Sequence, residues 1–89
     1  LALWTLRMPL LHLNVGQTLV LCLPRSVRVR HGIDGWQSPT DTDSIDSGLG
    51  LHVVPLPTAS LGAGTQIDFT FFWTDGAHWE GHDFHVEFI

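Results

Sequence analysis

The sequence predicts an all-β fold, an immunoglobulin-like antiparallel β-sandwich. Apolar and polar residues alternate with a period of two in several segments, glycine and proline recur at short intervals, and no long segment has helical spacing. The 89 residues suffice for a single domain over positions 1–89 and are too few for two. Hydrophobic residues make up 44% of the chain and charged residues 15%, so we expect a packed core and not a disordered segment.

Three segments carry the clearest strand signal, because apolar residues fill every second position and polar residues fill the others. They are Val27–Arg30, Gln66–Phe71 and Asp83–Phe88. Each should form a strand with one buried and one exposed face.

Four further segments are expected as strands, which brings the total to about seven. They are Leu3–Met8, Leu10–Val15, Thr18–Leu23 and Leu51–Leu56. Leu10–Val15 and Thr18–Leu23 are separated by Gly16-Gln17, a spacing that predicts a hairpin between them. The remaining stretches Gly32–Gly50, Thr58–Gly64 and Thr74–Gly81 are expected as loops, where specificity commonly resides.

Charge and apolar run lengths exclude two classes of partner. Four basic against nine acidic residues leave a net charge of -5, which does not suit a nucleic-acid binder. The apolar runs are too short to span a bilayer, and no basic segment precedes an apolar one, so we expect neither a membrane span nor a signal peptide. Cys22 is the only cysteine; it cannot form an internal disulfide, and its apolar neighbours predict a buried side chain.

The segment Trp73–Phe88 is the first candidate metal site, because His78, His82 and His85 lie close together in it. The helical zinc motif requires a glutamate directly after its first histidine, whereas Trp79 follows His78. On a strand His82 and His85 would point to opposite faces. We therefore expect no zinc site.

A second candidate is the acidic segment that carries Asp41, Asp43 and Asp46 and ends at Gly48, since hard cations such as calcium prefer carboxylate oxygens. It lacks the spacing and the terminal glutamate of the EF-hand loop, and clusters of this kind also form turns with their own backbone. It is a weak calcium candidate, and no cofactor is expected.

Catalysis by a carboxylate pair, for example Asp75 with Glu80 or Asp83, would need a walled cleft that raises one pKa. A sandwich of this size has little material to enclose a substrate. We therefore expect no autonomous enzymatic activity.

The tryptophans are the most informative residues. Trp36 follows Asp34-Gly35, and Trp79 follows a turn that begins at Asp75, so we expect both indoles to be exposed on neighbouring loops. The alternative is that they cap the ends of the core. Polar side chains that can bond hydroxyl groups would surround this platform. They are Asp34, Gln37, Asp75 and His78.

An apolar platform with a polar rim matches a pyranose ring, which has an apolar face and an equatorial belt of hydroxyls. Trp73 continues an inward-facing row and is expected in the core.

Two segments resemble one known family. Val27–Gln37 is similar to the strand and turn that end in a ligand-stacking tryptophan in the starch-binding carbohydrate-binding modules of families 25 and 53. Phe71–Phe84 resembles their second signature, in which an aromatic strand runs into Asp-Gly, a Trp-acid pair and an Asp-aromatic pair. Together with the edge strand at Leu51–Pro57, the resemblance covers about Val27–Val86 in the right order.

The resemblance implies an immunoglobulin-like fold and an α-1,4-glucan ligand, such as starch, glycogen or maltooligosaccharides. Trp36 and Trp79 would stack on adjacent glucose units. The family has a histidine on the first strand; here either Arg30 replaces it or His31 serves from the next position.

The resemblance also implies a non-catalytic module, linked covalently to the catalytic domain of an amylase-type enzyme and extracellular as part of a secreted protein. The rival hypothesis is a structural accessory β-sandwich of a glycoside hydrolase, which packs on the catalytic domain and binds no sugar. A calcium-dependent adhesion domain is a third, weaker hypothesis.

Overall fold

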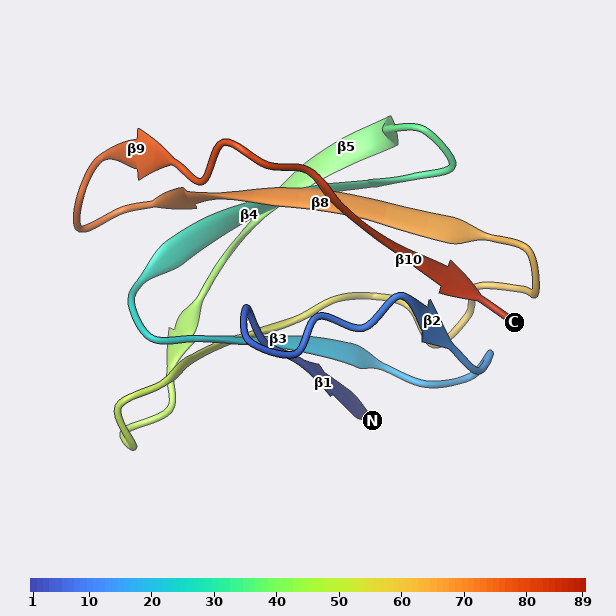
Figure 1. Cartoon of the computed structure of the whole chain (residues 1–89), viewed down its shortest axis with the longest axis horizontal. Helices are drawn as coiled ribbons and strands as arrows, with labels where there is room; N and C mark the ends of the chain where they lie inside the picture. Colours follow the sequence, from blue (N-terminus) through green and yellow to red (C-terminus); the bar gives the residue numbers. More distant parts are fainter.

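Two mixed β-sheets face each other across one apolar core in the computed structural model, which describes residues 1–89 (Figure 1). The four-stranded sheet has, in spatial order, β1 (Ala2–Trp4), β3 (Leu19–Leu23), β7 (His52–Pro55) and β6 (Ile45–Asp46). The six-stranded sheet has the order β2 (His12–Leu13), β10 (Phe84–Phe88), β8 (Gln66–Trp73), β4 (Val27–Ile33) and β5 (Gln37–Asp43), and β9 (His78–Trp79) pairs with β8. There is no helix, and hence none that could cross a membrane.

The core is rich in aromatic side chains, and β8 supplies most of them. Every second residue of β8 points inward, and these four side chains are all buried: Ile67, Phe69, Phe71 and Trp73. Trp4 comes from the opposite sheet and packs edge-on against Phe69, with ring centroids 5.1 Å apart, and against Phe84 at 4.9 Å. Trp4 thereby ties the two sheets together, because its ring contacts β8 and β10 at once.

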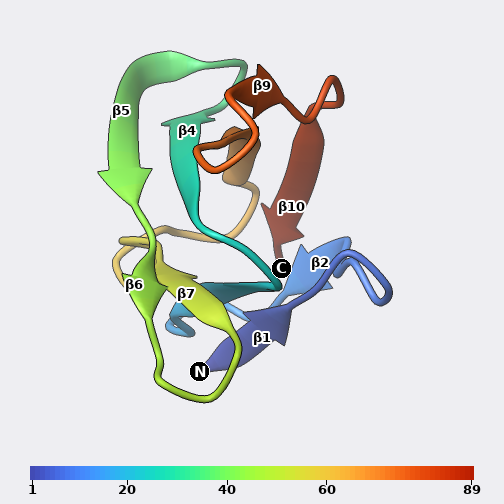
Figure 2. The ribbon, with the colours of Figure 1, turned by 90° about the vertical axis from the view of Figure 1, so that its left-hand side faces the viewer.

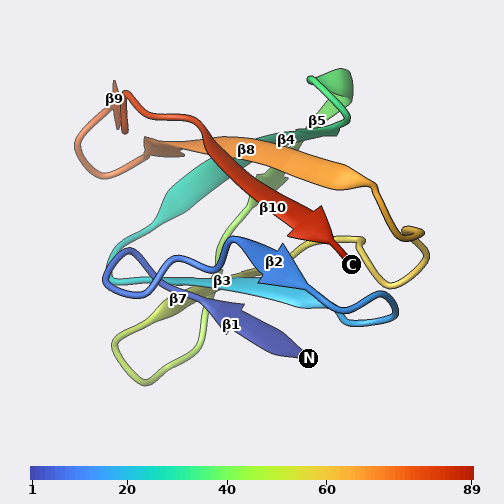
Figure 3. The ribbon, with the colours of Figure 1, turned by 45° about the vertical axis from the view of Figure 1, so that its right-hand side comes forward.

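The all-β prediction is confirmed, and the three alternating segments form β4, β8 and β10. A purely antiparallel arrangement is wrong, because β1 pairs with β3 and β2 pairs with β10 in parallel. The predicted hairpin across Gly16-Gln17 is also wrong. Its two segments enter different sheets, β2 beside β10 and β3 beside β7, as Figure 3 shows. The short stretch between them crosses from one layer to the other.

The expected loop Gly32–Gly50 contains two strands, β5 and β6. β5 lies at the edge of the six-stranded sheet beside β4 (Figure 2). Its sequence from Gln37 to Asp43 has no large apolar side chain, and nearly all of it is exposed. Edge strands often carry charged and polar residues and proline, so periodicity in hydrophobicity does not reveal them.

Burial of the single residues follows the strand period. Trp73 is buried, as predicted, and so is Trp4. Cys22 is only partly buried, so the prediction of a core cysteine is wrong. On β3 the residues Leu19, Leu21 and Leu23 point inward, which places Cys22 on the opposite side of the strand.

Replacing Phe69 with alanine should lower the free energy of unfolding by about 3–5 kcal/mol, because the change removes a fully buried ring that contacts Trp4 and Phe84. Urea denaturation followed by fluorescence measures the effect. The control is Leu49→Ala, since Leu49 is 86% exposed and its removal should change stability by less than about 0.5 kcal/mol. Equal effects of the two substitutions would contradict the assigned core.

Candidate functional site

The outer face of the six-stranded sheet is the surface turned away from the core. It is built from the polar positions of the alternating strands, among them Arg28 and Arg30 on β4 and Asp41 and Asp43 on β5. Antiparallel pairing places these residues opposite one another. Arg28 Nε bonds Asp43 Oδ1 at 2.7 Å, and Arg30 Nε bonds Asp41 Oδ1 at 2.9 Å. Two ion pairs therefore lie across the β4–β5 boundary.

Trp79 lies on this outer face with 46% of its surface exposed. The indole meets the ring of Phe72 edge-on, with centroids 5.3 Å apart, and Arg30 Cζ lies 5.1 Å from the indole centroid. Arg30 therefore bonds Asp41 and also covers part of the indole, an arrangement that combines a cation–π contact with an ion pair.

Bonds to the neighbouring residues hold Trp79 in this position. Glu80 accepts a hydrogen bond from Trp73 Nε1 at 2.8 Å, and the Glu80 backbone N–H donates to the carbonyl of Phe71 at 2.9 Å. The guanidinium of Arg25 lies over the Trp73 ring at 4.7 Å. The short hairpin of β8 and β9 is thus anchored through the residue after Trp79, which leaves the indole on the outside of the sheet.

The Arg30–Asp41 pair changes the titration of both groups. The hydrogen bond from Arg30 lowers the pKa of Asp41, and the hydrogen bond to Asp41 raises the pKa of Arg30. Both side chains are solvent-accessible, so the pair adds little to stability. Its consequence is chemical: beside Trp79 there are charged donors and acceptors whose net charge is zero.

A buried carboxylate organises the other end of the outer face. The side chain of Asp68 is 1% exposed although it lies on the outward row of β8. Asp68 Oδ2 accepts from the backbone N–H of Gly35 at 2.8 Å and of Trp36 at 3.0 Å. Its other oxygen accepts from Gln66 Nε2 at 2.6 Å and contacts His85 Nδ1 at 2.5 Å.

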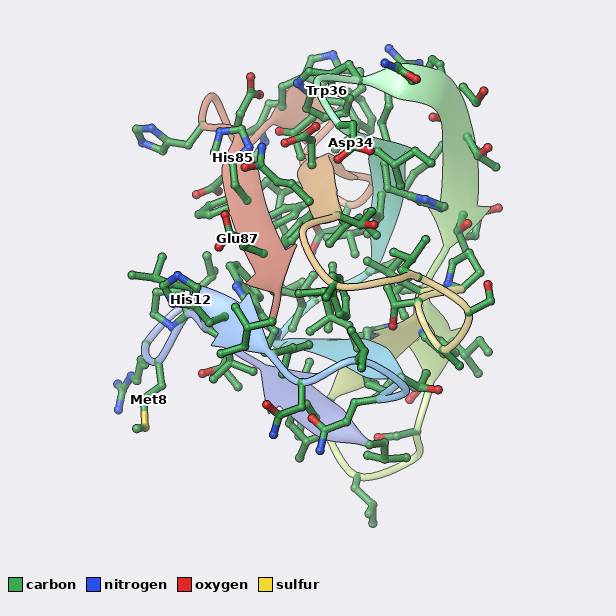
Figure 4. All side chains as sticks on the ribbon, turned by 90° about the vertical axis from the view of Figure 1, so that its right-hand side faces the viewer. Met8, His12, Asp34, Trp36, His85 and Glu87 are labelled. Carbon is green, nitrogen blue, oxygen red and sulfur yellow. The ribbon has the colours of Figure 1, made fainter.

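The β4–β5 turn over Asp68 has an unusual backbone. Three successive residues, Asp34, Gly35 and Trp36, have positive φ angles of 47°, 86° and 69°. A positive φ angle strains the backbone of a tryptophan, so contacts with the rest of the protein must hold the turn. It also passes close to Gly32, where a Cβ atom would come within 2.9 Å of Trp36 Cα. Figure 4 shows Trp36, Asp34 and His85 at this same end of the sheet.

Burial by itself would raise the pKa of Asp68, but the hydrogen bonds outweigh it. The bonds from Gln66, His85 and the two backbone N–H groups favour the ionised form, and the pKa lies below its usual value. Asp68 is therefore a carboxylate at neutral pH.

The expectation that Trp36 and Trp79 occupy neighbouring loops is wrong. Trp36 is held by Asp68 near the start of β8, whereas Trp79 pairs with Phe72 near its end. Four residues of strand, about 13 Å, separate these two positions. Figure 1 shows the β4–β5 turn and β9 at opposite ends of the sheet. Trp36 is also only partly exposed.

The other predicted site residues divide between these two ends and the interior. Arg30 faces outward beside Trp79, while His31 is 6% exposed and bonds Thr42 Oγ1 at 2.9 Å on the inner side. Of the two alternatives for the family's histidine, Arg30 is thus the one on the outer face.

Asp75 and His78 lie in and after the β8–β9 turn, at the end of the sheet that carries Trp79. Both are exposed, and Asp75 Oδ2 lies 3.7 Å from Arg25 Nε. Asp34 and Gln37 lie at the opposite end, where Asp34 Oδ1 accepts from the backbone N–H of Gln66.

The weak calcium candidates have other partners. Asp41 and Asp43 pair with arginines, and Asp46 Oδ1 accepts from the backbone N–H of Gly48. No group of three or more histidine, cysteine, aspartate or glutamate side chains is close enough to share a metal ion.

Asp68 and Phe72 are site residues that the sequence did not predict. Both fall on the outward row of an alternating strand, where an exposed side chain is the ordinary expectation. The one available signal was Asp34-Gly35, a turn pair that can fold back over the neighbouring strand.

Comparison with protein-family models, with curated proteins and with solved structures gives no match.

The Asp68→Asn variant should be less stable than the parent by about 1.5–3 kcal/mol at pH 7, since hydrogen bonds to a charged group contribute about this much. The pKa of Asp68 is lower in the folded state than in the unfolded chain. Its contribution is therefore complete above about pH 4 and is lost as the pH falls through the folded-state pKa. Urea titrations at several pH values test this.

The stability difference between parent and Asp68→Asn should shrink as the pH falls below about 4. Asp83→Asn is the control, because Asp83 is an exposed carboxylate with no ion pair. A difference that stays constant from pH 7 to the acid limit would show that the charge of Asp68 does not hold the turn.

Proposed function

We propose that this chain is a non-catalytic carbohydrate-binding module that binds α-1,4-glucan on the outer face at Trp79. The observation that carries the proposal is the indole of Trp79, which is 46% exposed and is the one aromatic ring among the large exposed hydrophobic side chains. An indole offers a rigid apolar surface at little entropic cost. The apolar face of a glucose ring matches such a surface.

The polar groups beside Trp79 suit hydroxyl groups. The guanidinium of Arg30 carries five N–H donors, of which two are used by bonds to Asp41, and the Asp41 oxygens can accept further hydrogen bonds. Because the two charges compensate each other, the site favours a neutral polymer over an acidic one. Asp75 and His78 lie at the same end and extend the set of polar contacts.

The proposed site is an open surface. None of the three pockets on the chain includes Trp79. An exposed indole can bind along the side of a long polymer. Catalysis would instead need an enclosed site that excludes water. We expect weak binding, with a Kd of about 0.1–1 mM, or about -4 to -5.5 kcal/mol.

Weak binding would be useful through a covalently linked amylase-type catalytic domain in a secreted enzyme, because attachment to insoluble glucan raises the effective substrate concentration. The immunoglobulin-like form of the sandwich belongs to the same proposal; its support is two sheets that pack over one core in a chain of 89 residues.

A specific observation also favours the rival function, a structural accessory domain. The outward side of the four-stranded sheet is apolar: Leu3 lies beside Val20, and Val53 lies between Cys22 and Ile45. Leu3 is 56% and Ile45 59% exposed. We call these five residues the apolar face. These five side chains carry no charge, and Arg7 borders them beside Cys22. An apolar surface of this kind suits packing on a linked catalytic domain.

Electrophoresis through a gel that contains soluble starch tests the proposed function. The parent chain should be retarded, and Trp79→Ala should lose at least about tenfold in affinity, which corresponds to about 1.4 kcal/mol. Titration with maltoheptaose should quench the fluorescence of the parent and leave that of Trp79→Ala nearly unchanged.

The matched control is Trp36→Ala, which removes an indole from the other end of the sheet and should change the affinity by less than about twofold. Circular dichroism verifies that both variants are folded. Equal mobility of all three proteins with and without starch would reject the glucan proposal and favour the accessory domain.

A further inference from the structure

A small pocket lies at the edge of the six-stranded sheet, on the inner side and away from Trp79. It has a volume of about 180 Å³ and is formed where β4 ends, β5 begins and the loop between β7 and β8 passes. Pockets for drug-sized ligands usually measure about 300–1,000 Å³. This pocket has room for a single small ring.

His31 is the central polar group of the pocket. Its side chain is almost completely buried, and Nε2 bonds Thr42 Oγ1 at 2.9 Å. Nδ1 makes no hydrogen bond to the protein. All fully buried side-chain nitrogen and oxygen atoms of the chain have a hydrogen-bond partner, so an atom without one must be accessible. Nδ1 is therefore not fully buried, and His31 is one of the residues that line the pocket.

The walls of the pocket differ in chemistry. Beside His31 the pocket is lined by Gln37, Ser38 and Thr40, which carry an amide and two hydroxyl groups. The Thr40 hydroxyl donates to the Ser38 carbonyl at 3.4 Å and can still accept a hydrogen bond. The apolar side chains of Leu61 and Ile67 lie on the remaining walls, with Pro57. No charged side chain lines the pocket, so a carboxylate or phosphate would lose its hydration without gaining a counter-charge.

Burial lowers the pKa of His31, against the opposing effect of Asp41, so the imidazole is neutral at pH 7. A neutral imidazole uses one nitrogen as donor and the other as acceptor. With Nε2 bonded to Thr42, Nδ1 supplies the complementary function to one hydroxyl group.

We propose that this pocket is a second binding site, which holds one neutral polyhydroxylated ring, such as a single sugar or the end of a sugar chain, with a hydroxyl bonded to His31 Nδ1. This site is separate from the proposed glucan site at Trp79, because it is formed by different residues. It would also hold a ring by its edge, whereas Trp79 would contact the side of a polymer. It can exist whether or not Trp79 binds glucan.

NMR of the histidine ring signals tests the proposal, with D-glucose as the probe. The chain has six histidines, and His31→Gln identifies the signal of His31 by its disappearance. The His31 signal should move saturably with glucose, with a Kd of millimolar order. D-glucuronate, which adds a carboxylate, should bind at least about tenfold more weakly.

Two variants separate this pocket from the outer face. Thr40→Val keeps the shape and removes a hydroxyl from the wall, and should raise the Kd about fivefold. Thr70→Val makes the same change on the outward row of β8 and should leave the Kd unchanged. The His31 shift should persist in Trp79→Ala, so that failure of the glucan proposal and failure of this one give different results.

Three results would overturn the proposal: no saturable shift of His31, binding of glucuronate as tight as that of glucose, or loss of the shift in Trp79→Ala. The last would mean that glucose binds only on the outer face. A folded Thr40→Val protein with unchanged affinity would also count against it.

Discussion

The structure depends on the two-residue period of β8. Its inward side chains, Phe69 and Phe71 among them, fill the core and meet Trp4 of the other sheet. Its outward side chains include Asp68 and Phe72, which organise the two ends of the outer face. One strand therefore couples stability to the site, because a shift of register by one residue would exchange the two rows.

Asp68 and Arg30 show how differently a charge acts when it is buried and when it is exposed. The Arg30–Asp41 pair lies in solvent, where such pairs contribute little to stability. Asp68 is removed from water and is compensated by two backbone N–H groups and two side chains. Those bonds offset the cost of burying a carboxylate, and they hold the turn at Trp36 in a backbone conformation that the sequence would not adopt freely.

The two sheets present different surfaces to the solvent. The outer face presents Trp79 beside a pair of compensated charges, which suits a neutral glucan in spite of the net charge of -5. The apolar face on the other sheet has no charged side chain. Under the proposed function the outer face would meet the glucan, whereas under the rival function the apolar face would pack on a linked catalytic domain. The pocket at His31 is the proposed site for a single ring.

The local sequence pattern sufficed to predict the all-β class and the strands β4, β8 and β10. Each of these strands has one face in the core and one in solvent, so apolar and polar residues alternate along the sequence. It also predicted Trp73 in the core. Pairing partners were decided by the tertiary structure: β1 and β2 join different sheets in parallel, and β5 becomes a strand by bonding along β4 although it has no apolar face. The same holds for the site. Trp36 and Trp79 lie apart because their turns contact opposite ends of β8. Asp68 is buried because a turn more than 30 residues earlier in the chain folds over it. Such long-range contacts leave no periodic trace in the sequence, since they arise only when distant segments pack.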